Sequence, residues 1–119
     1  MRDWKKYTVW QLAHQFVLEI YKETLNFPKE EDYNISSQLR RASSSIPTNI
    51  VEGAGRDSEA EFNRFLIIAQ GSANEVQYLL LLAKDLGYLN LNKYDKLEDE
   101  IDKIKRMLYK LSKRLSNKK

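Results

Sequence analysis

The chain has 119 residues with a formal net charge of +3, and it contains no cysteine. This length predicts a single domain, over residues 1–119, that is large enough for a hydrophobic core. The absence of cysteine excludes a disulfide framework and a thiolate metal site. The N-terminus carries no apolar signal segment, and the longest strongly apolar run, residues 79–83, is far too short to cross a membrane. We therefore expect a cytoplasmic protein that binds no membrane.

The first predicted helix runs from about Val9 to Asn26. Apolar residues recur there three and four positions apart, which is the spacing of one helix face. They are Trp10, Leu12, Ala13, Phe16, Val17, Ile20 and Phe27. Pro28 ends the helix because it pushes the preceding residue out of the helical region. The polar segment 29–34 is expected to form a loop.

The second predicted helix begins at Ser36 or Ser37, either of which is a good N-cap, and ends at Ala54. Its apolar stripe consists of Leu39, Ala42, Ile46, Ile50 and Gly53. Pro47 lies inside this stripe and removes a backbone donor, so we expect a kink or a break there. Such a conflict between a local rule and the overall pattern tends to mark function or a special packing need.

The third predicted helix has the clearest boundaries. Ser58 and Glu61 fit a capping box at its start, and Gly87 fits a left-handed C-cap at its end. One heptad seam consists of Phe62, Leu66, Ala69, Ala73, Val76, Leu80 and Ala83. A second seam consists of Phe65, Ile68, Ser72, Leu79, Leu82 and Leu86. Two seams on one helix predict two neighbouring helices.

The fourth predicted helix starts near Asn92 and keeps a strict heptad to the end of the chain. The heptad positions are Tyr94, Leu97, Ile101, Ile104, Leu108, Leu111 and Leu115. No acidic residue follows Asp102, whereas eight basic residues do. One-sided charge of this kind indicates an anionic partner. The alternative is that these side chains only form the solvated face of a helix.

These four amphipathic segments predict an all-α fold, an antiparallel up-down four-helix bundle. Nothing alternates with period two for long enough to be a strand. Some apolar residues exceed what the bundle core needs, and they would leave surface for self-association. They are Trp10, Phe16, Tyr78 and Leu81.

The residue pattern does not support an enzyme. His14 is the only histidine, and its place beside the first apolar stripe predicts a surface or boundary residue rather than a catalytic base. The chain has no Glu-x-x-His motif for a di-metal site, and we predict neither a metal nor a cofactor. Residues 53–58 superficially resemble a phosphate loop, but no strand precedes them and no Gly-Lys-Ser/Thr follows. We expect them to connect two helices.

Charged residues around the second helix predict a structural network. Glu52 and Glu75 lie close to apolar stripes, and a buried carboxylate needs a charged or hydrogen-bonding partner. The expected members on and beside the second helix are Arg40, Arg41, Asn49, Glu52 and Arg56. From the sequence, this set either holds the structure together or touches a ligand.

The sequence QLRRASSSIPTNIVEG at residues 38–53 resembles the bacterial 23S rRNA-intervening-sequence proteins, also called S23 or four-helix-bundle proteins. The likeness extends to most of the chain, including residues 10–13, 61–62, 69–72 and 86–88. It implies a four-helix bundle that assembles as a homopentamer, and some members are encoded inside insertions in the large ribosomal RNA gene. It also implies a relation to the accessory protein of diversity-generating retroelements, which binds nucleic acid and a reverse transcriptase.

Charge and resemblance together predict a non-enzymatic, oligomeric bundle that binds RNA or DNA electrostatically. The candidate phosphate contacts are Arg40, Arg41, Arg56, Arg106, Lys110, Lys113 and Arg114. The alternative is a protein–protein adaptor or scaffold whose oligomer recruits another protein.

Overall fold

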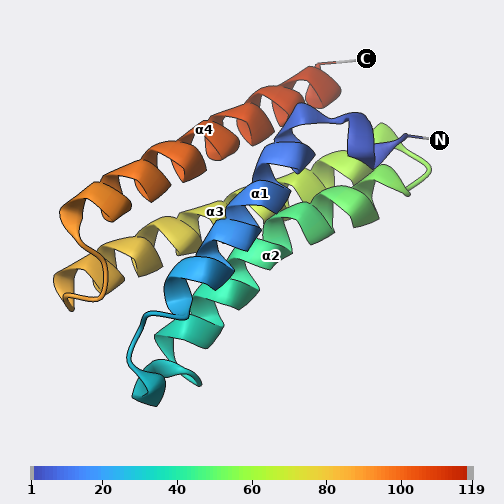
Figure 1. Cartoon of the computed structure of the whole chain (residues 1–119). Coiled ribbons are helices and arrows are strands. Elements are labelled where there is room, and N and C mark those ends of the chain that lie inside the picture. Colours follow the sequence, from blue (N-terminus) through green and yellow to red (C-terminus); the bar gives the residue numbers. More distant parts are fainter. Residues whose placement is uncertain (1, 118–119) are drawn as a thin grey trace.

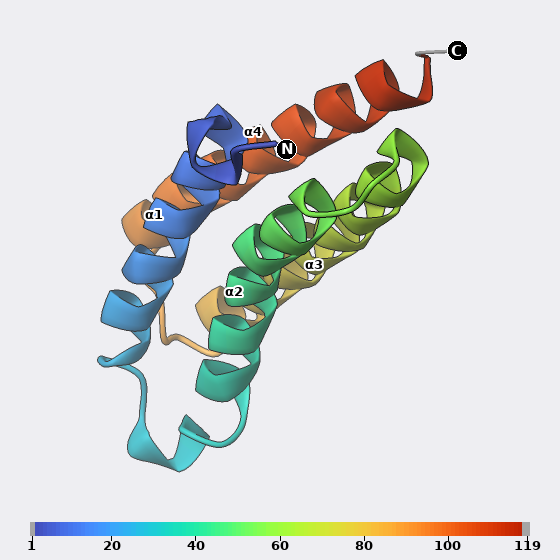
Figure 2. The same ribbon diagram turned by 90° about the vertical axis from the view of Figure 1, so that its right-hand side faces the viewer.

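The computed structural model describes residues 2–117, and four long helices make up most of this part of the chain. The helical elements are η1 (Trp4–Lys6), α1 (Thr8–Thr24), η2 (Lys29–Glu31), α2 (Ile35–Ala54), α3 (Glu59–Asp85) and α4 (Leu91–Ser116). Each long helix packs on its neighbours in chain order, and α4 returns to α1 (Figures 1 and 2). The predicted antiparallel four-helix bundle is confirmed. It is elongated, with extents of 48 × 22 × 20 Å.

The helix ends confirm several of the predicted caps. The Ser58 hydroxyl accepts a hydrogen bond from the Glu61 amide, which begins α3. Gly87 adopts φ +84° just after α3 ends. Helix α1 stops two residues earlier than predicted, at Thr24, whose hydroxyl donates back to the Ile20 carbonyl at 2.7 Å. A side chain that bonds its own preceding turn competes with continuation of the helix.

The core lies along the axis of the bundle and is built from the predicted stripes. Every residue of the first α3 seam is buried, as is every stripe residue of α2. The second α3 seam is only partly correct, because Ile68 and Leu86 are exposed. Phe16, which we expected to add to the apolar surface, is instead 1% exposed because α1 turns it into the core.

Helix α2 passes through Pro47 without a break, so that part of the prediction is wrong. Pro47 is buried, and α2 packs against α1 on one side and α3 on the other. This packing holds the residues around the proline in helical conformation although one backbone donor is missing. Pro47 therefore acts as a packing residue inside a continuous helix.

Helix α3 is long and apolar enough to meet the length and composition criteria for a membrane-spanning helix. Core helices of globular proteins meet the same criteria. Its nine buried residues pack against α2 and α4 in the bundle, which accounts for part of its apolar composition.

Candidate nucleic-acid interface

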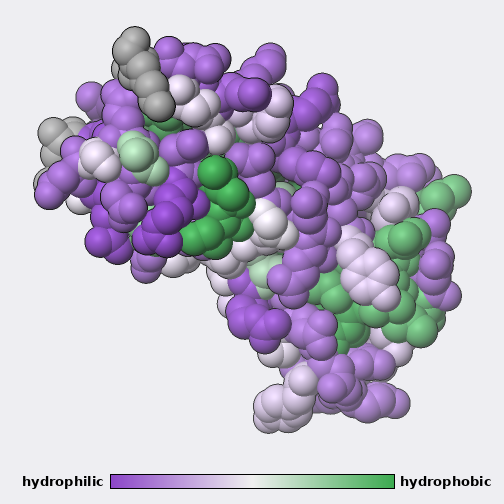
Figure 3. All heavy atoms as spheres, turned by 180° about the vertical axis from the view of Figure 1, so that it is seen from behind, coloured by the Kyte–Doolittle hydropathy of each residue, from purple (hydrophilic) through white to green (hydrophobic). Residues whose placement is uncertain are grey.

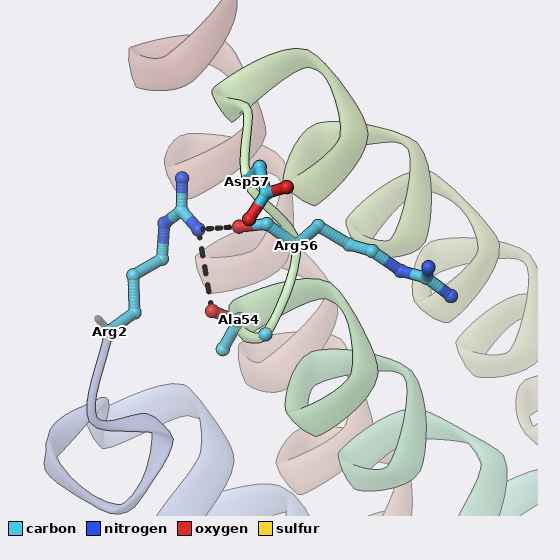
Figure 4. Close-up of a pocket in the computed structure, with 5 residues that line it drawn as sticks. Arg2, Ala54, Arg56 and Asp57 are labelled. Atoms are coloured by element: carbon cyan, nitrogen blue, oxygen red, sulfur yellow. Dashed lines mark hydrogen bonds between the residues drawn. The ribbon is translucent and has the colours of Figure 1, made fainter.

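Three segments that are distant in sequence meet at one end of the bundle, where both chain ends lie (Figure 1). They are residues 2–7, the loop 55–58 between α2 and α3, and the last turns of α4, and we call this region the basic end. The Arg2 guanidinium joins the first two segments, because its Nη1 donates to the carbonyls of Arg56 at 2.7 Å and Ala54 at 3.3 Å (Figure 4). The Ser112 hydroxyl joins α4 to α3 by donating to the Asn63 side chain.

The outer face of α4 carries a row of cations. Arg106, Lys110 and Lys113 follow one another at four- and three-residue spacing, on the side opposite the core, and are exposed. Arg106 is paired with Asp102 at 3.1 Å, and the Lys113 ammonium lies 5.7 Å from the centre of the Tyr109 ring. Within residues 2–117, Lys110 and Lys113 form no ion pair, so their charge is available to an anion.

Arg114 connects this row to the N-terminal segment. It lines an open hollow of about 310 Å³ together with Lys6, Tyr7 and Met107. The tertiary structure thus adds basic residues of the N-terminal segment to the α4 cations. Arg2, Lys5 and Lys6 were missed in the sequence analysis, although three basic residues among the first six were a visible signal.

Arg56 lies at the same end and lines the same hollow as Arg2, but its side chain extends away from Arg2 (Figure 4). Its guanidinium lies 4.9 Å from the centre of the Phe65 ring. Acidic residues, Glu59 and Glu61, occupy the first turn of α3, where they already complement the positive helix end. The loop therefore serves as a helix connection, as predicted, rather than as a phosphate loop.

Arg40 and Arg41 lie apart from the other candidates, roughly 20 Å from Arg56 along α2 at ~1.5 Å per residue. The Arg40 Nε donates to the Thr24 hydroxyl at 2.8 Å, and its guanidinium covers the Tyr21 ring at 4.8 Å. This arrangement fixes the end of α1 on α2. The sequence pattern could not place these two arginines, because it does not show which helix faces them.

Among the described residues, the predicted polar network is correct only in the pairing of Arg41 with Glu75. Arg41 makes an exposed ion pair with Glu75 of α3 at 3.9 Å. The Asn49 side chain donates to the Ser45 carbonyl of its own helix at 2.8 Å. Glu52 is exposed and needs no buried partner. The side chains point to different neighbours because successive residues of a helix face different directions.

A second group of charges lies between α1 and α4. The Lys96 ammonium contacts Glu19 at 3.0 Å, and Lys93 contacts Glu23 at 3.2 Å. Glu19 and Glu100 line a small cavity of about 160 Å³. Burial, and then the neighbouring Glu19 carboxyl group, raise the pKa of Glu100 to about 6. The group holds α1 against α4, and no cluster of three metal-ligating side chains occurs in the described part of the chain.

His14 occupies the surface position that we predicted. It is exposed, and its ring stacks on Trp10 with centroids 5.2 Å apart and an interplanar angle of 4°.

The fold and the basic end define a small all-α protein, a four-helix bundle with a group of exposed cations at one end. The family model of the 23S rRNA-intervening sequence protein matches residues 5–110, and the chain belongs to this family. A similar solved structure is a protein with unknown function from the S23 ribosomal protein family of Bacteroides thetaiotaomicron. It is 28% identical, with a TM-score of 0.81 over 89% of this chain and 99% of the other. No curated protein matches the sequence.

Proposed function

We propose that this protein is a non-enzymatic oligomer that binds RNA or DNA electrostatically through its basic end. The row of cations on α4 carries the proposal, because Lys110 and Lys113 are exposed and form no ion pair within residues 2–117. Cations spaced by about one helix turn, ~5.4 Å, suit contacts with successive phosphates. Membership of a family named for an rRNA intervening sequence supports RNA as the first ligand to test.

The test compares two charge reversals of equal size. Lys110→Glu with Lys113→Glu changes the basic end, whereas Lys22→Glu with Lys29→Glu makes the same change in net charge at the opposite end of the bundle. Binding of a labelled structured RNA is measured by fluorescence anisotropy from 50 to 200 mM salt. We expect the first variant to bind more weakly, with a slope of log affinity against log salt smaller by roughly two, one for each lost phosphate contact.

The control variant should keep most of the affinity of the wild type. Equal losses in both variants would show that only net charge matters, and the proposed site would be abandoned. If wild-type affinity at low salt were no better than that of an unrelated protein of equal charge, the nucleic-acid function itself would be rejected.

The proposed oligomer rests on the outer face of α3. Four apolar side chains are exposed there, and they are Tyr78 (61%), Ile67 (56%), Ile68 (42%) and Leu81 (38%). Seen from behind, hydrophobic surface gathers in two places on the molecule (Figure 3). Exposed apolar surface on several turns of one helix is typical of an association site. We take the homopentamer implied by the family resemblance as the state to test.

Light scattering after gel filtration tests this assembly. A pentamer has a mass of about 70 kDa, five times the 14.0 kDa of one chain. Ile67→Asp with Tyr78→Asp should give a folded species of lower mass, because two charges enter the contact. The control, Tyr33→Asp, changes a residue that is 95% exposed in the loop before α2 and should leave the mass unchanged. A monomeric wild type at micromolar concentration would refute the oligomer.

The exposed face of α3 also favours a second candidate function, a protein–protein adaptor. A pull-down from cell extract with and without nuclease separates the two functions. A partner that survives nuclease treatment supports the adaptor, and loss of every partner supports nucleic-acid binding.

A further inference from the structure

The N-terminal segment forms an open hollow of about 420 Å³ against the end of α2. Its lining consists of Arg2, Asp3, Trp4, Lys5, Val51 and Gly55. This volume falls within the range of small-molecule sites, roughly 300–1,000 Å³. The hollow borders the one in Figure 4, with which it shares Arg2 and Gly55.

The aromatic wall of the hollow is held in place by a ladder of rings. The Trp4 ring packs edge to face on Trp10, with centroids 4.7 Å apart at 62°, and Trp10 in turn stacks on His14. Trp4 is half-buried and packs against the core. A ring fixed in this way can stack on a flat ligand without first losing rotational freedom.

Two cations stand beside this ring. The Lys5 ammonium lies over the Trp4 ring, 5.3 Å from its centre. The Arg2 guanidinium lies over the Phe62 ring, 4.7 Å from its centre, and its Nη1 donates to the Ala54 and Arg56 carbonyls. The other N–H groups of the guanidinium are left for an anion. The single opposing charge in the lining is Asp3, whose carboxylate also accepts the Lys5 amide as the cap of η1.

A flat ring and two cations in one hollow suit a single nucleotide, because its base can stack on the ring and its phosphate can pair with the cations. Bases in a duplex are already stacked on each other, whereas unpaired bases are free to stack on aromatic side chains. We propose that this hollow, the Trp4 hollow, binds one unpaired base of a single-stranded nucleic acid on Trp4, with Arg2 and Lys5 on its phosphate. The inference rests on the proposed function and adds the class of ligand, single strands or unpaired loops.

The tryptophan emission of the wild type reports directly on this site. The chain has two tryptophans, and both belong to the ladder. Titration with an oligothymidylate should quench the emission, whereas a duplex of the same length should bind through the cation row with little quenching. Equal quenching and equal affinity for single strand and duplex would overturn the Trp4 hollow but leave the proposed function in place. Failure of both nucleic acids to bind at low salt would reject both.

Two variants test the role of the ring itself. Trp4→Leu keeps an apolar side chain but no ring, and it should lose single-strand affinity by about five- to a hundred-fold, the usual effect of removing one stacking residue. Trp4→Phe keeps a ring and should retain most of the affinity. Circular dichroism checks that both variants remain helical. If Trp4→Leu unfolds, Lys5→Ala is tested instead, and we expect it to bind single strands more weakly than the wild type. Unchanged single-strand affinity in a folded Trp4→Leu protein would contradict the inference.

Discussion

Substitution of Gly53 by alanine tests a close contact between α2 and α3. A Cβ atom at this position would meet the Phe65 Cβ at 2.8 Å, the Phe62 Cδ1 at 2.9 Å and the Phe62 carbonyl oxygen at 3.2 Å. Alanine favours a helix interior over glycine by about 1 kcal/mol. Overpacking in a core costs about 1–3 kcal/mol, and we expect the upper half of this range because two of the three neighbours are fixed to the backbone of α3.

The net effect of Gly53→Ala should be a loss of about 1–2 kcal/mol in the free energy of unfolding. With an unfolding entropy of about 2.1 cal/mol/K per residue, this lowers the Tm by about 4–8 °C. Thermal denaturation at a fixed protein concentration measures it. The matched control is Gly55→Ala, where the added Cβ meets nothing closer than the Glu52 carbonyl at 3.6 Å. The control should equal or exceed the wild type in Tm, and a Gly53→Ala protein as stable as this control would refute the argument.

Two further predictions concern Glu100 and Arg40. The folded protein binds the Glu100 proton more tightly than the unfolded chain, since burial raises the pKa from 4.5 to about 6. Proton binding by Glu100 therefore adds to the free energy of unfolding. This contribution is fully present below about pH 4.5 and is lost as the pH rises through about 6. Glu100→Gln should therefore flatten the dependence of Tm on pH in this window, and an unchanged slope would show that the group does not titrate there. Arg40→Lys should lower stability in urea by about 1 kcal/mol, through loss of the hydrogen bond to Thr24 and of the planar contact with Tyr21. It should leave RNA affinity unchanged, so a stable variant with weakened binding would assign Arg40 to a ligand instead.

The helices and their ends could be predicted from the sequence because both depend on neighbours in the chain. Spacings of three and four gave the buried stripes of α2 and α4. The Ser58 cap and the left-handed Gly87 followed from the preferences of single residues. Pro47 was one exception, because packing on both sides of α2 overcame its local tendency to break a helix. The start of α2 was another, because the helix begins at Ile35 with Asn34 as its N-cap, and Ser36 is buried inside it.

The candidate site was predicted only in part. The cations of α4 were visible as a run in the sequence, since no acidic residue follows Asp102. Arg40 resembled these cations in charge alone, and the structure packs its side chain against α1 rather than placing it at the basic end. Charge is a property of a residue, whereas a site is a property of the distances between residues that the fold brings together.

The sequence by itself therefore determined four amphipathic helices, their order and an excess of positive charge near the C-terminus. Only the tertiary structure decided that Lys6 shares a hollow with Arg114 of α4, and that Trp4 lines another open hollow with Arg2 and Lys5. The physical reason is that helix periodicity and capping act over a few residues. The basic end depends on contacts between segments more than fifty residues apart, such as the one from Arg2 to Arg56.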